Sequence, residues 1–75
     1  MTQTAYGVLL FHTTWAALRA EKVLKDAALP CKLIPVPRQF SSNCGLALRF
    51  SWDARDAVAA AMEAAGVEVA EVHPL

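Results

Sequence analysis

The sequence has no excess of charge of either sign, because seven lysines and arginines balance seven aspartates and glutamates. Nucleic-acid-binding proteins usually carry a basic surface, and disordered tails combine a net charge with few apolar residues. This chain is instead 56% apolar. We therefore expect a folded domain that does not bind nucleic acid.

Long apolar runs are also absent. Residues 8–11 form a run with the length of a β-strand, far short of the roughly 20 apolar residues that a membrane-spanning helix needs. Residues 1–4 have no basic segment of the kind that opens a signal peptide. These absences predict no membrane partner and a cytoplasmic location.

Cysteine and histidine are scarce. The chain has only Cys31 and Cys44, and its two histidines are His12 and His73, with no CxxC or HxxxH spacing among them. Two thiols in a reducing cytoplasm would not persist as a structural disulfide, and these residues do not form a metal-binding pattern. We expect no metal ion and no cofactor.

Sequence patterns typical of catalysis are missing as well. The chain has no glycine-rich phosphate loop and no nucleophile elbow, and its acidic residues do not form a pair that would share a pocket. A chain of 75 residues also has little room for a substrate cavity. We therefore expect a protein that carries a group rather than an enzyme.

What the sequence does contain is an alternation of strand and helix patterns. Short apolar runs bounded by polar residues predict four strands. These lie at residues 6–11, 31–36, 45–50 and 67–72. Pro35 cannot donate a hydrogen bond to a neighbouring strand, which favours a sheet edge for the second strand.

Residues with high helix propensity predict two helices between these strands, at 15–28 and 54–65. A hydroxyl from Thr13 or Thr14 is expected to cap the first helix. Asp53 is expected to cap the second helix or to be an acid of its first turn, and Gly66 is its expected C-terminal stop.

The order strand, helix, strand, strand, helix, strand is that of a ferredoxin-like α+β fold with a split βαβ pattern (βαββαβ). Right-handed crossovers then place both helices on one face of a four-stranded antiparallel sheet with strand order 4-1-3-2. We expect residues 1–75 to form this single domain.

The predicted first strand is apolar on both sides, with Val8 and Leu10 on one and Leu9 and Phe11 on the other. Two helices can cover only one face of the sheet. We therefore expect some apolar area to stay exposed on the other face, where a homodimer would bury it.

A polar stretch between the second and third predicted strands delivers Cys44 to the start of an apolar strand. Antiparallel pairing with the first strand brings Cys44 near His12, and near the start of the first helix at Thr13 and Thr14. The N-terminus of a helix carries partial positive charge, which favours a thiolate. Cys44 is therefore the candidate reactive residue.

Three further residues support this site. Arg38 would add positive charge, His12 would accept a proton, and Gly45 would leave room for close approach. A purely structural interpretation stays open, in which Cys44 is a small buried apolar residue and His12 and Arg38 are solvated. Cys31 starts the second strand, at the opposite end of the hairpin, so it is expected to be a packing residue that forms no disulfide with Cys44.

Four segments of the sequence resemble the selenium/sulfur carrier protein-like family. They are FHTT at 11–14, ALRAEKVLK at 17–25, LIPVPR at 33–38 and SSNCGLALRF at 41–50. The likeness extends over nearly the whole chain, and its most specific part is the proline-arginine loop that ends in Cys44-Gly45. The tryptophans and Cys31 are not part of it.

The resemblance implies that Cys44 carries sulfur or selenium, as a persulfide or a selenenyl sulfide. It also implies two kinds of partner, a protein that donates the sulfur or selenium and a protein that accepts it. The alternative is a non-catalytic ferredoxin-like interaction module, homodimeric through its sheet, in which Cys44 is structural.

Overall fold

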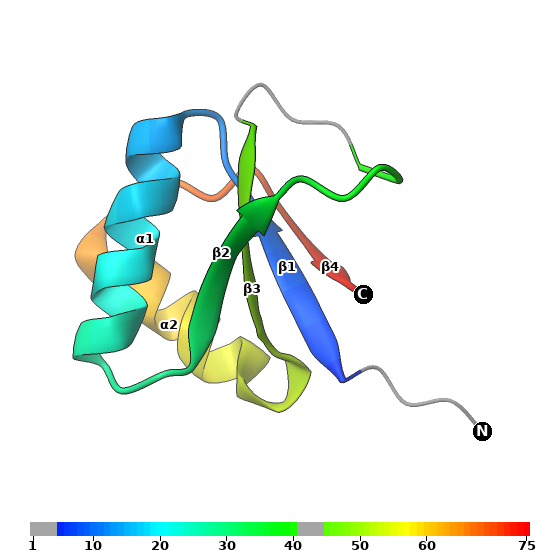
Figure 1. Ribbon diagram of the computed structural model, residues 1–75. Coiled ribbons are helices and arrows are strands. Elements are labelled where there is room, and N and C mark those ends of the chain that lie inside the picture. Colours follow the sequence, from blue (N-terminus) through cyan, green and yellow to red (C-terminus); the bar gives the residue numbers. More distant parts are fainter. Residues whose placement is uncertain (1–4, 41–44) are drawn as a thin grey trace.

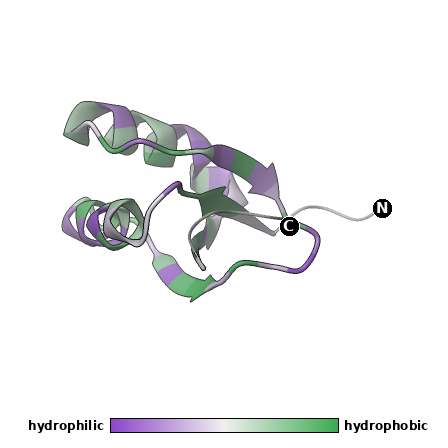
Figure 2. Cartoon of the chain, turned by 90° about the horizontal axis from the view of Figure 1, so that it is seen from above, coloured by the Kyte–Doolittle hydropathy of each residue, from purple (hydrophilic) through white to green (hydrophobic). Residues whose placement is uncertain are grey.

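The computed structural model describes residues 5–40 and 45–75, which form one sheet and two helices (Figure 1). The elements are β1 (Tyr6–Leu10), α1 (Thr14–Asp26), β2 (Cys31–Pro35), β3 (Leu46–Ser51), the 3₁₀ helix η1 (Trp52–Ala54), α2 (Arg55–Ala65) and β4 (Glu71–Pro74). Figures 1 and 2 show both helices on the same side of the sheet. In the part of the chain that the structure describes, neither helix is long and apolar enough to cross a membrane.

The sheet is antiparallel and has the strand order β2-β3-β1-β4. This is the predicted order, and it places β2 at an edge, as Pro35 indicated. The ferredoxin-like fold is therefore confirmed. β1 lies between β3 and β4 and carries apolar side chains on both sides. Both faces of the sheet therefore have to be covered at this strand.

The main core fills the space between the helices and the sheet. Its fully or nearly fully buried members are Leu9, Phe11, Ala17, Ala20, Leu24, Leu48, Phe50, Val58, Met62 and Val67. On α1, the buried positions Ala17 and Ala20 carry small side chains, so the helix can lie close to the sheet. Leu24 completes the buried side of α1.

The helix ends follow local chemistry, with one difference from expectation. The Thr13 hydroxyl accepts a hydrogen bond from the Ala16 amide at 3.1 Å and caps α1, and Gly66 ends α2 in the left-handed conformation with φ 68°. Asp53 was predicted to cap α2 or to lie in its first turn, and neither holds for α2, whose first-turn acid is Asp56. Asp53 lies inside η1, and α2 begins after Ala54 with no side-chain cap.

The last strand begins later than the sequence suggested. Residues 67–72 were predicted as the strand, but β4 starts at Glu71 and includes His73. After Gly66 the chain first turns Val67 into the core, where its amide donates to the Met62 carbonyl at 3.0 Å. The apolar residues that looked like a strand therefore pack at the end of α2 instead.

The second face of the sheet, opposite the helices, is covered by the chain itself. Val8 and Ala47 are completely buried there, and Leu10 is 1% exposed. The residues that pack over them are Ile34, Val36 and Phe40. The expectation that Val8 and Leu10 leave apolar area exposed is therefore wrong. The homodimer inferred from that area loses this support, and oligomeric state stays a prediction.

Gly7 in β1 provides a test of how tightly the sheet packs. A Cβ atom at this position would lie 2.5 Å from Cζ of Phe50 and 2.5 Å from Cε3 of Trp52. We expect Gly7→Ala to lower the free energy of unfolding by about 2–3 kcal/mol through overpacking, measured by urea denaturation.

The control is Gly45→Ala, because a Cβ at Gly45 meets no atom within 4 Å. This substitution should change the free energy of unfolding by less than about 0.5 kcal/mol. Equal effects of the two substitutions would contradict the account of Gly7.

Candidate functional site

The end of β1 and the start of β3 lie at the same end of the sheet. Leu10 pairs with Ala47, so the antiparallel paths lead next to His12 on one strand and Gly45 on the other. α1 begins at Thr14, directly after His12 and Thr13, and Figure 1 shows its N-terminus at this end of the sheet. Cys44 lies outside the described residues and precedes Gly45 in the sequence.

His12 is accessible at this end of the sheet. Its side chain is 55% exposed, and its Nε2 lies 3.7 Å from Oε1 of Glu68. An exposed pair of this kind contributes little to stability. Among residues 5–40 and 45–75, no three His, Cys, Asp or Glu side chains are grouped so as to hold a metal ion.

The N-terminus of α1 keeps its positive electrostatic character. The helix has 13 residues, no acidic residue in its first turn, and Lys25 in its last turn. Its dipole corresponds to roughly half a positive charge at the N-terminus. No carboxylate in the first turn offsets this charge, although the carboxylate of Glu68 lies at the same end, 3.7 Å from Nε2 of His12. The positive end of α1 is therefore a favourable neighbour for an anion such as a thiolate.

Arg38 lies on the segment that follows β2, and because Cys44 is outside the described residues its supporting role stays a prediction. It lies in an exposed turn, closed by a 3.0 Å hydrogen bond from the Phe40 amide to the Pro37 carbonyl. Val36 and Phe40, on either side of the turn, pack on the second face of the sheet. The structure therefore unites His12, Thr13 and Thr14 with the start of β3, and places Arg38 across the sheet from α1.

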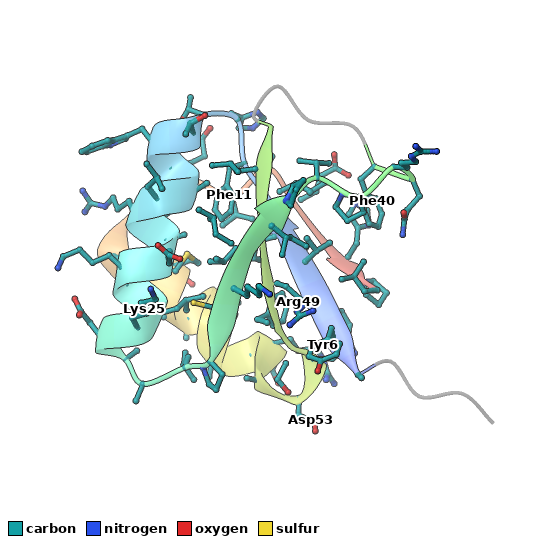
Figure 3. All side chains as sticks on the ribbon, in the orientation of Figure 1. Tyr6, Phe11, Lys25, Phe40, Arg49 and Asp53 are labelled. Atoms are coloured by element: carbon teal, nitrogen blue, oxygen red, sulfur yellow. The ribbon has the colours of Figure 1, made fainter. Side chains whose placement is uncertain are left out.

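Residues 36–40, which we call the covering segment, are held to the sheet at two points. The Val36 amide donates to the Gly45 carbonyl at 3.4 Å. The ring of Phe40 stacks on the ring of His73 in β4, with centroids 4.4 Å apart and 17° between the planes. Figure 3 shows Phe40 on the side of the sheet away from the helices. The chain is thus fixed on both sides of residues 41–44.

Phe40 and His73 are positioning residues that the sequence did not reveal. The predicted last strand ended at residue 72 and so excluded His73, whereas β4 includes it and its Nε2 lies 2.8 Å from Oε1 of Glu71. Phe40 was one residue of a polar loop. No local pattern links the two, because their contact depends on β4 pairing with β1.

Cys31 lies at the other end of the sheet and pairs with Phe50. Between Gly45 and Phe50 the chain advances about 16 Å, at about 3.3 Å per residue. The Sγ atom of Cys31 lies 4.0 Å from the carbonyl oxygen of Glu21 on α1. Burial, and next the negative charge of Glu21, raise the pKa of the Cys31 thiol. Cys31 is therefore a packing residue with a suppressed thiolate, as predicted.

Comparison with known proteins identifies the family of this chain. The family model described as "Putative Se/S carrier protein-like" matches residues 6–74. No curated protein and no solved structure matches the chain significantly. The matched region includes every helix and strand of the structure.

The role of Phe40 can be tested by substitution. Phe40→Ala removes the stack on His73 and part of the cover over the second face, so the free energy of unfolding should fall by about 2 kcal/mol. The Val36 amide should also exchange with deuterium faster, because its hydrogen bond to Gly45 closes the segment.

Phe40→Leu is the matched control, since it keeps an apolar side chain and loses only the stacking. Its effect on unfolding should be smaller, about 1 kcal/mol. If Phe40→Ala leaves both unfolding and exchange unchanged, the ring does not hold the covering segment.

Proposed function

Because the chain belongs to the Putative Se/S carrier protein-like family, we propose that it is a small cytoplasmic thiol carrier that holds sulfur or selenium on Cys44. The observation that carries this proposal is the family match over residues 6–74. The structure adds a plausible physical setting, since the residue that follows Cys44 lies at the end of the sheet where α1 begins.

The proposed loading step is a thiol–persulfide exchange. The Cys44 thiolate attacks the terminal sulfur of a persulfide on a donor enzyme. A bond forms between Sγ of Cys44 and that sulfur, the S–S bond of the donor breaks, and the donor cysteine leaves as a thiolate. The step needs no external oxidant or reductant. Selenium would transfer in the same way from a selenenyl sulfide on the donor.

The second step passes the group to an acceptor protein. A thiolate of the acceptor attacks the terminal sulfur of the Cys44 persulfide, and Cys44 leaves as a thiolate. The carrier returns to its starting state without chemical change. It therefore acts as a transfer protein in this proposal and not as an enzyme.

The surroundings of Gly45 suit such an exchange between proteins. Gly45 is exposed, and an added Cβ there would meet no atom within 4 Å. A partner therefore finds open space beside Gly45, the residue that follows the proposed carrier residue in the sequence. The N-terminus of α1, with Thr13 and Thr14, would stabilise the thiolate, and His12 would accept the thiol proton.

Loading can be measured directly by intact mass. After incubation with a cysteine desulfurase and cysteine, the wild-type protein should gain one sulfur atom. Cys44→Ser should gain none, because the accepting thiol is lost, whereas Cys31→Ser should load like the wild type.

Two outcomes would count against this assignment. A Cys44→Ser protein that still gains sulfur would exclude Cys44 as the carrier residue. A wild-type protein that gains no sulfur would favour the alternative, a non-catalytic interaction module in which Cys44 is structural.

The pH dependence of alkylation tests the electrostatics. A thiol reacts as its thiolate, and burial with the Glu21 charge raises the pKa of Cys31, so the Cys31 thiolate appears only as the pH rises further. We expect Cys44 to have a lower pKa than a free thiol, and iodoacetamide to modify it before Cys31 at neutral pH, as followed by peptide mass.

Two substitutions separate the sources of this effect. His12→Ala should change the pH profile of Cys44 little if the α1 N-terminus is the main cause. Arg38→Ala should change it only modestly, because an exposed cation is screened by salt. Alkylation of Cys44 no faster than that of Cys31 would refute the argument.

A further inference from the structure

A groove with apolar walls runs along the side of α1 that faces away from the sheet. It is lined by Trp15, Leu18, Arg19, Lys22, Val23 and Asp26, and has a volume of about 470 Å³. Trp15 is 73% exposed and Leu18 is 45% exposed. Figure 3 shows the side chains on this side of α1 reaching into solvent. We call this groove the α1 surface.

The exposure of Trp15 sets this surface apart. Trp15 is the most exposed of the large hydrophobic residues that the structure describes, and no core contact explains its size. Tryptophan and arginine are the residue types that dominate binding energy at the centres of protein interfaces. Here Trp15 and Arg19 lie together, one turn apart on the helix.

The charges of the α1 surface favour an acidic partner. Arg19 and Lys22 lie at its middle, and Asp26 lies at its far end, where its Oδ2 is 3.9 Å from Nζ of Lys22. The carboxylate of Asp26 partly offsets the positive charge of Lys22. The positive charge of Arg19 remains, and its Nη2 also donates a hydrogen bond to the Ala65 carbonyl at 3.1 Å. Among the residues that line the α1 surface, two cations therefore stand against one carboxylate, that of Asp26, while the carboxylate of Glu68 lies in the adjoining hollow.

The same charges disfavour a second copy of the chain as the occupant. If two α1 helices paired antiparallel about the middle of the groove, Arg19 would face Lys22 of the second copy. If they paired parallel, each cation would face the same cation of the second copy. Like charges meet in both arrangements, which weakens the association.

The α1 surface continues to the end of the sheet that holds the candidate site. Trp15 and Arg19 also line a second hollow of about 370 Å³, together with His12, Thr13 and Glu68. A protein seated on α1 would thus extend over the N-terminus of the helix toward Gly45. Two hollows that share an exposed tryptophan and an arginine form one continuous contact area.

From this continuity we propose that the α1 surface docks the sulfur-donor enzyme, through an apolar pocket on the donor flanked by carboxylates. The inference rests on the proposed carrier function. A donor must bring its persulfide within bonding distance of Cys44, so it has to contact this end of the sheet. Trp15 would fill the pocket, and Arg19 and Lys22 would pair with the acidic rim.

The test compares two ways of loading the full-length protein. One uses a cysteine desulfurase with cysteine, which requires docking, and the other uses inorganic polysulfide, which does not. Trp15→Ala should lower the rate of desulfurase loading by about tenfold or more and leave polysulfide loading unchanged. Lys22→Glu should lower the desulfurase rate about threefold to tenfold, with a weaker effect at high salt.

Each variant has a matched control on another surface. Val72→Ala removes an apolar side chain that is 47% exposed on β4, and Lys32→Glu reverses an exposed lysine on β2. Both controls should load from the desulfurase at the wild-type rate. Thermal unfolding of each variant checks that Trp15→Ala and Lys22→Glu keep the fold.

The outcomes separate the docking surface from the carrier function. Wild type and variants that load equally fast from the desulfurase would overturn the docking surface alone, and so would a wild type that loads only from polysulfide. A wild type that loads from neither source would overturn the carrier function, and with it the docking proposal.

Discussion

The burial of β1 on both faces is the constraint on which the rest of this structure depends. β1 lies between β3 and β4, so its side chains alternate between two interiors, with Leu9 toward the helices and Val8 and Leu10 toward the second face. A four-stranded sheet with two helices has enough helix to cover one face only. The chain therefore has to supply a second cover, and it does so with residues 36–40.

This second cover decides where the loop before β3 starts and ends. Phe40 packs on the cluster of Val8, Leu10 and Ala47 at the second face. Its ring also stacks on His73. The chain must then return to Gly45, which hydrogen-bonds to Val36 at the base of the loop. Burial of apolar area on β1 thus fixes both ends of the stretch that contains Cys44. An interaction that stabilises the fold also positions the candidate site.

The sequence was sufficient for the order of elements and for most of their buried positions, because those depend on local periodicity and on the handedness of crossovers. It also identified Gly66 at the end of α2 and narrowed the cap of α1 to Thr13 or Thr14, of which the structure shows Thr13. The sequence prediction failed where tertiary contacts, and not the local sequence pattern, determine the conformation of a residue. Val67 continues an apolar run and yet packs in the core at the end of α2. Asp53 lies inside η1, which precedes α2. The contact between Phe40 and His73 had no local signal, since it joins the covering segment to β4, which is far away in the sequence.

The separation of the two cysteines has a chemical consequence for a carrier. A persulfide is attacked by any thiolate within reach, and an attack by a second thiol of the same chain would form a disulfide and release the sulfur. Cys31 is kept from this reaction in two ways. The strand between Gly45 and the partner of Cys31 spans about 16 Å at about 3.3 Å per residue, and burial beside Glu21 raises the pKa of the Cys31 thiol, so that little thiolate forms at neutral pH. A protein with this arrangement can hold a second, partly buried cysteine against its core without a resolving thiol near the site. In the proposed function, the group on Cys44 then leaves only when another protein approaches.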